Sequence, residues 1–194
     1  LAQAAILALK AMHDARRAAL EGPGAPEQAH AGDAPSQVGA PVAADTIVLD
    51  GREISRPLYM IFLSEADELI ETLVEDAADW RERPERGATD AAMRAAHSLS
   101  GSASVVELAP VHDLAERLES FMQSQRVVGD APSGAELQLV ARIVERVRSM
   151  LHVFAAGHLP PHEPDALEAI AALAAYWHEK AQALAARTIA VDGP

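Results

Sequence analysis

Residues 135–156 read AELQLVARIVERVRSMLHVFAA, and this stretch decides the fold class. Its apolar side chains recur in a strict alternation of three and four positions: Leu137, Val140, Val144, Val147, Leu151 and Phe154. Because an α-helix turns once every 3.6 residues, this spacing puts all of them on one stripe of a helix. The stretch therefore predicts an amphipathic helix that buries one face against neighbouring helices.

Three earlier stretches, residues 56–82, 89–107 and 110–126, are also expected to form amphipathic helices. Pro57 lies in the first turn of its helix, where a missing N–H is harmless, and Thr89 or Asp90 can cap the next helix. Proline and glycine break the chain between the helices at Pro84, Gly87, Gly129, Pro132 and Gly134. No stretch shows the alternation of a strand. The prediction is an all-α protein with an antiparallel up-down four-helix bundle.

The bundle is expected to span residues 47–157, between segments of different composition. Residues 21–46 are rich in Pro, Gly and Ala, which is typical of a linker, and residues 1–20 suit a helix from a preceding module or an N-terminal extension. Residues 158–164 form a second break. A C-terminal helix over residues 165–187 either packs on the bundle or leads to the next module. Since the chain begins with leucine rather than methionine, it is expected to be a fragment.

Composition excludes several classes of function. A net charge of −13 disfavours binding to DNA, RNA or an anionic membrane surface, all of which attract basic patches. No apolar run reaches the roughly 18 residues of a membrane-spanning helix, and the N-terminal residues lack the pattern of a signal peptide. The chain contains no cysteine, which excludes disulfides and thiolate chemistry. A cytoplasmic location is therefore expected.

The helix expected at 89–107 contains an outward-facing histidine. At 100° per residue its core side is made of small and branched apolar residues: Ala92, Ala95, Ala96, Leu99, Ala103 and Val106. His97 lies roughly 150° from the centre of that stripe, on the outer face. The same rotation places these residues around it: Met93, Arg94, Ser100, Gly101 and Ser104.

Gly101 lies in the middle of this helix, where glycine costs about 1 kcal/mol relative to alanine. One explanation is that bare backbone one turn after His97 lets a partner approach the imidazole closely. The other is that Gly101 marks a close crossing of two helices and that His97 is an ordinary surface histidine. The spacing alone leaves both open.

Residues 97–103, HSLSGSA, resemble the phosphoacceptor motif of histidine-phosphotransfer (Hpt) domains, which usually reads His-Thr/Ser-Leu-Lys-Gly-Ser-Ala. Residues 61–69, IFLSEADEL, resemble the first bundle helix of Hpt modules in chemotaxis-type and pilus-motility multidomain hybrid histidine kinases. Residues 114–119, LAERLE, resemble the helix after the motif, which commonly reads Leu-Ala-His-x-Leu-Glu. The resemblance covers about residues 50–157 in the order and spacing of the family.

The resemblance implies a phosphocarrier in a two-component phosphorelay rather than an enzyme that is catalytic alone. His97 would attack phosphorus through one ring nitrogen, since neutral imidazole is a nucleophile near neutral pH. The donor would be ATP held by a histidine kinase catalytic domain or the phospho-aspartate of a response-regulator receiver domain, and receivers would accept the group. The family implies no cofactor bound by this chain. Mg²⁺ and ATP would belong to the partner domains.

Two positions depart from the family pattern. Ser100 replaces the family lysine, and Arg94, one turn before His97, is hypothesised to supply the missing cation. Glu107 stands where glycine is common and adds negative charge and bulk. The residues expected to shape the docking and phosphoryl environment are Arg94, Ser98, Ser100, Gly101 and Ser104. The alternative function is a degenerate Hpt-like bundle that only docks receivers within a sensor kinase.

Other candidate sites are weaker. His152, His158 and His162 with Glu163 suggest metal ligands, but a Pro-Pro break spoils their helical spacing, so no metal site is predicted. His112 follows the motif at an offset from His97 that gives no catalytic pairing. A helical dimer of the kinase-dimerisation kind is disfavoured, because four helices complete a core within one chain.

Overall fold

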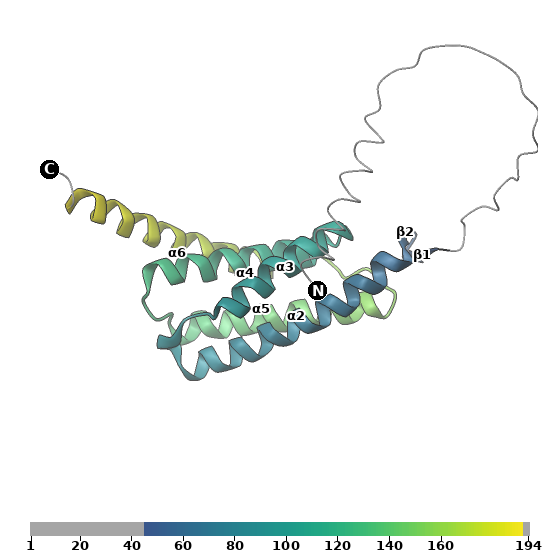
Figure 1. Ribbon diagram of the computed structural model, residues 1–194, viewed down its shortest axis with the longest axis horizontal. Helices are drawn as coiled ribbons and strands as arrows, with labels where there is room; N and C mark the ends of the chain where they lie inside the picture. Colours follow the sequence, from purple (N-terminus) through teal and green to yellow (C-terminus); the bar gives the residue numbers. More distant parts are fainter. Residues whose placement is uncertain (1–44, 192–194) are drawn as a thin grey trace, which may run out of the picture.

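The computed structural model describes residues 45–191, with side chains through residue 187 (Figure 1). The elements in chain order are β1 (Thr46–Leu49), β2 (Arg52–Ser55), α2 (Arg56–Glu82), the 3₁₀ helix η1 (Pro84–Arg86), α3 (Asp90–Val105), α4 (Ala109–Val128), α5 (Gly134–Ala155) and α6 (Pro164–Val191). The helix predicted at 1–20 and nearly all of the predicted linker 21–46 lie outside the described residues. Within the described part, none of the helices is long and apolar enough to cross a bilayer.

The helices begin and end where local chemistry permits. The Oγ1 of Thr89 accepts a hydrogen bond from the backbone N–H of Ala92 and so caps α3. Ser133 and Glu136 form a reciprocal capping box at the start of α5. Gly129 ends α4 in the left-handed conformation, with φ of 76°. The four bundle helices predicted from spacing are confirmed, each within two residues of its expected bounds.

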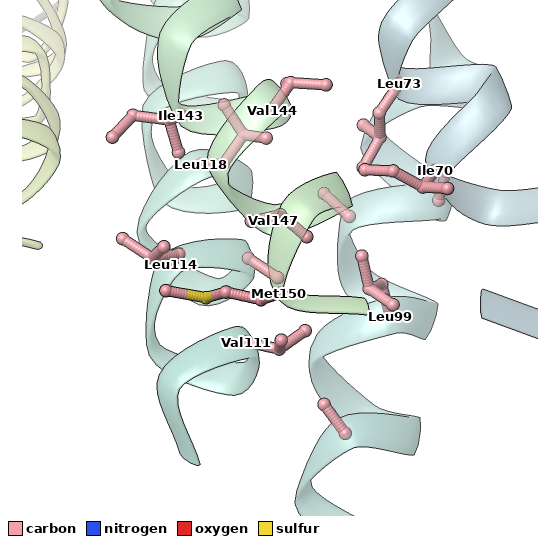
Figure 2. Close-up of a cluster of buried hydrophobic side chains, with 14 of the residues drawn as sticks. Ile70, Leu73, Leu99, Val111, Leu114, Leu118, Ile143, Val144, Val147 and Met150 are labelled. Atoms are coloured by element: carbon pink, nitrogen blue, oxygen red, sulfur yellow. The ribbon is translucent and has the colours of Figure 1, made fainter. Parts of the chain in front are cut away.

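The core lies between α2, α3, α4 and α5, where α2 packs against α3 and α5, and α4 packs against the same two helices. Apolar side chains from all four helices gather there (Figure 2). The labelled members of this cluster are Ile70, Leu73, Leu99, Val111, Leu114, Leu118, Ile143, Val144, Val147 and Met150. Burying such side chains gives about 25 cal/mol for each Å² removed from water, which makes the bundle the main source of stability.

The C-terminal helix α6 packs on α4, on the outside of the bundle (Figure 1). Trp177 of α6 lies edge-on to Phe121 of α4, with ring centroids 5.9 Å apart, and Phe121 stacks in turn on Trp80 of α2 at 5.7 Å. The indole N–H of Trp177 also donates to Glu136 at 2.8 Å. Three aromatic rings therefore join three helices. Beyond Ala181 the described side chains of α6 are exposed, and the helix extends past the end of the bundle.

A small antiparallel hairpin corrects the expectation that no strand occurs. β1 and β2 pair from Thr46 with Ser55 to Leu49 with Arg52, across a two-residue turn. Asp50 and Gly51 form the turn with φ of 48° and 86°, the two positive values that a type I′ turn requires. Asp-Gly between short alternating segments is a strong hairpin pattern that the helical periodicity obscured. Leu49 and Ile54 bury the inner face.

The hairpin turn is fixed to the connection between α5 and α6. The carboxylate of Asp50 accepts a hydrogen bond from the backbone N–H of Leu159 at 2.7 Å and faces the Nδ1 of His158 at 3.3 Å. The hydrogen bond from Leu159 makes the largest contribution to lowering the pKa of Asp50, and the contact with His158 lowers it further. The segment predicted only as a break therefore serves as an anchor for the N-terminal hairpin.

Replacing Glu136 with glutamine is expected to reduce stability at pH 7 but not at low pH. Burial opposes ionisation of this carboxyl, yet hydrogen bonds from Ser133 and Trp177 and the charge of Lys180 outweigh it, so its pKa is lowered. A lowered folded-state pKa stabilises the fold above the unfolded value of 4.5, and this contribution disappears as pH falls through the folded value. Glutamine keeps the capping box without the charge. Urea unfolding of both proteins at pH 7 and at successively lower pH should show a difference in unfolding free energy that shrinks as the pH falls.

Candidate functional site

The outer face of α3 presents His97 to solvent. Its side chain is 74% exposed, whereas the alanines on the opposite face are buried against α2 and α4. Those small residues let α3 lie close to both neighbours and leave no room for an inward rotation of the imidazole. The outward placement predicted from helical geometry is confirmed.

The ring of His97 is held by a carboxylate on the neighbouring helix. Its Nδ1 lies 3.0 Å from Oε1 of Glu119 in α4, and the Glu119 side chain is only 16% exposed. Since an ionised carboxylate only accepts hydrogen bonds, Nδ1 carries the proton. In the neutral ring, Nε2 is then left with its lone pair. The site thus holds a nucleophilic nitrogen in a fixed tautomer.

Glu119 was missed from sequence as a site residue, although it closes the LAERLE segment. It lies 22 positions after His97, and only the packing of α3 against α4 brings the two together. A histidine on one helix and an acid on the next is a common pattern. The pairing depends on the register of two helices, which sequence spacing does not determine.

Gly101 lies one turn beyond His97 in open space. A Cβ added there would meet no neighbouring atom within 4 Å. The explanation of Gly101 as a close helix crossing is therefore wrong for the described part of the chain. Packing against neighbouring helices therefore does not require a glycine at position 101. The absence of a side chain there leaves the approach to the His97 ring from solvent unobstructed.

The placement of Ser100 on the outer face is wrong. Ser100 is only 6% exposed, because α4 covers that side of α3. Both its Oγ and its carbonyl oxygen lie 3.0 Å from Nδ1 of His112, which belongs to α4. Helical rotation puts Ser100 about 60° from His97, enough to turn it into the interface. Ser100 and His112 connect α3 to α4 instead of facing a partner.

The remaining predicted site residues surround His97 on the accessible side. Arg94 and Ser104 are exposed and Ser98 is half-buried. Ser98 accepts a hydrogen bond at its carbonyl from Ser102 Oγ, which turns that hydroxyl into the helix. Among the described residues, Arg94 has no ion-pair or hydrogen-bond partner. Its guanidinium is therefore available to an anion beside His97.

Glu107 adopts a left-handed conformation, with φ of 54°, directly after α3. Its backbone N–H and that of Leu108 bond to Ser104 and Ala103, the pattern of a Schellman cap, in which glycine is favoured. Arg52 of the hairpin donates to the carbonyls of Val106 and Glu107 and pairs with the Glu107 carboxylate at 3.1 Å. Arg52 therefore partly neutralises the negative charge that Glu107 was expected to add on the docking side.

The histidines considered as metal ligands do not assemble in the structure. His158 contacts Asp50 of the hairpin, and Glu163 pairs with Arg146 of α5. Across residues 45–191, no group of three or more His, Asp or Glu side chains is arranged to hold a metal ion.

The family model described as the Hpt domain matches residues 57–187, about two thirds of the chain. The match begins at the second residue of α2 and extends into α6, so it includes the whole bundle and the His97 site. No curated protein matches the chain.

Proposed function

Because the chain belongs to the Hpt domain family, whose members perform histidine phosphotransfer in two-component phosphorelays, we propose that His97 is the residue that carries the phosphoryl group. The observation that carries this assignment is the contact of its Nδ1 with Glu119, which leaves Nε2 unprotonated on an exposed ring. Among the residues predicted to surround the site on α3, His97 alone combines a nucleophilic atom, exposure and an orienting partner.

The proposed step needs no proton transfer. The lone pair on Nε2 attacks phosphorus in line, an N–P bond forms, and the P–O bond to the donor breaks, so that the donor leaves as a carboxylate or as ADP. The positive charge that develops on the imidazole is stabilised by the carboxylate of Glu119, which keeps its hydrogen bond to Nδ1–H. Transfer to an acceptor aspartate reverses these steps.

The docking face is proposed to consist of the solvent-accessible residues around the ring: Arg94, Ser98, Gly101 and Ser104. Arg94 would place a cation beside the phosphoryl oxygens. Ser100 is not part of this face, because it is buried against His112. Its role is to connect α3 to α4.

Hpt domains generally exchange phosphoryl groups with receiver domains. The proposed partners of this chain are response-regulator receivers and a histidine kinase catalytic domain, which would supply Mg²⁺ and ATP. A chemotaxis-type or pilus-motility hybrid kinase is the proposed context. Its support is the resemblance of residues 61–69 and 114–119 to the corresponding helices of those kinases.

The test is phosphorylation by a cognate kinase domain with labelled ATP, or by a labelled phospho-receiver. The expected product is one phosphoryl group per chain, labile in acid and stable in base, that moves to a fresh receiver on mixing. Receiver binding measured by calorimetry without any label transfer would contradict the proposal. That outcome would favour the docking scaffold.

Replacing Gly101 with leucine is expected to stabilise the fold by about 0.5–1 kcal/mol, since leucine is the better helix former and an added Cβ meets no neighbour within 4 Å. It should slow phosphotransfer about tenfold or more, because a side chain beside the ring holds the partner's reacting atom away from Nε2. Thermal unfolding and transfer kinetics measure the two effects.

The matched control is Gly134→Leu at the start of α5, where an added Cβ also meets nothing within 4 Å. This variant should transfer at the wild-type rate. Wild-type transfer by Gly101→Leu would show that the open space beside His97 has no role in docking.

A further inference from the structure

Glu119 is itself held by a third side chain. Gln123, one turn later on α4, lies with its Nε2 2.6 Å from Glu119 Oε1, the same oxygen that contacts Nδ1 of His97. Because the carboxylate can only accept, the amide of Gln123 must donate. One oxygen therefore receives two hydrogen bonds, one from the ring and one from the amide.

The backbone beneath these two residues is fixed by the core. Leu118, Phe121 and Met122 of the same turns are all at most 1% exposed. Glu119 still has three rotatable side-chain bonds, and a hydrogen bond to a ring as exposed as that of His97 is weak and mobile when nothing else restrains it. Gln123 supplies that restraint at i+4 spacing.

We infer that Gln123 is a positioning residue that fixes Glu119 and thereby keeps His97 in the tautomer with a free Nε2. The inference rests on the proposed role of His97 and extends it to a residue outside the motif. The neutral amide suits this task, because it orients the carboxylate without neutralising it. The full charge of Glu119 remains available when the imidazole becomes positive.

The test uses Gln123→Met, which keeps length and helix propensity but removes the donor. Nitrogen-15 NMR of the unphosphorylated protein, at a pH where the ring is neutral, reports the fraction of His97 with its proton on Nδ1. That fraction should fall about twofold in the variant, and phosphorylation of His97 should slow about three- to tenfold, the scale of one lost hydrogen bond. Gln123→Lys keeps a donor and should retain the wild-type tautomer.

Gln182→Met is the matched control, since Gln182 contacts His178 at the same spacing on α6. It should leave His97 unchanged. A wild-type His97 tautomer in Gln123→Met would overturn the inference, as would an equal change in Gln182→Met. The NMR measurement does not depend on phosphorylation, so a His97 that accepts no phosphate would refute the proposed function separately.

Discussion

Replacing His97 with glutamine is expected to remove all acid-labile phosphate from the protein while changing its unfolding free energy by no more than about 0.5 kcal/mol. The side chain is 74% exposed, and its one polar contact is with Glu119. Glutamine is a good helix former and its amide can donate to the same carboxylate, but it has no nucleophilic nitrogen. Label incorporation on gels, followed after acid and base treatment, measures the loss of phosphate. Urea unfolding measures the change in unfolding free energy.

The control for this variant is another exposed histidine. His152 on α5 lies on a different helix, and His152→Gln should incorporate label as the wild type does. His112→Gln tests the neighbour that contacts Ser100, and it should also retain a phosphoryl group. Acid-labile label that persists in His97→Gln and disappears in His152→Gln or His112→Gln would show that His97 is not the phosphoacceptor.

Truncating Phe121 to alanine is expected to cause the largest loss of stability of any single change considered, about 3–5 kcal/mol. Phe121 is fully buried and lies between Trp80 and Trp177, so its removal leaves a cavity and breaks two ring contacts. A loss of this size is a large share of the 5–15 kcal/mol typical of a folded domain. Guanidinium unfolding at 25 °C, followed by tryptophan fluorescence, gives the free energy.

If the alanine variant does not fold, Phe121→Leu preserves most of the volume and should cost less than half as much. Val127→Ala on the same helix is the control, because Val127 is 62% exposed and its truncation should change stability by at most about 0.5 kcal/mol. A small effect of Phe121→Ala would mean that α6 and α2 do not depend on α4 in the way the aromatic contacts indicate.

Helical periodicity predicted most of the fold from sequence. The apolar spacing of residues 135–156 identifies α5, because a helix that buries one face shows its period within its own residues. The same holds for α2, α3 and α4. The hairpin was missed because its strands are four residues each. Strands this short show too little alternation to be distinguished from a loop, so the Asp50-Gly51 turn is the main sequence evidence for the hairpin.

The site was predicted only where a single helix determines it. His97 and Gly101 face outward because α3 alone fixes their direction. Ser100 was misplaced because its direction, near the boundary of the buried face, depends on where α4 lies. The contacts of Glu119 and Gln123 with the site depend on the register between α3 and α4. The backbone strain at Glu107 comes from its left-handed φ, which the sequence indicated only through the glycine that is common at this position in the family.

The exposure of His97 on a single helical face has a kinetic consequence. With His97 as the proposed phosphoacceptor, a phosphoryl donor and an acceptor must reach the same nitrogen from the same side, so they cannot bind together. Each turnover then alternates between a phosphorylated and an unphosphorylated carrier. Double-displacement kinetics follow, with parallel lines in double-reciprocal plots. Unphosphorylated receiver in excess occupies the empty carrier and competes with the donor. Output through this protein should therefore pass through a maximum as the receiver concentration rises.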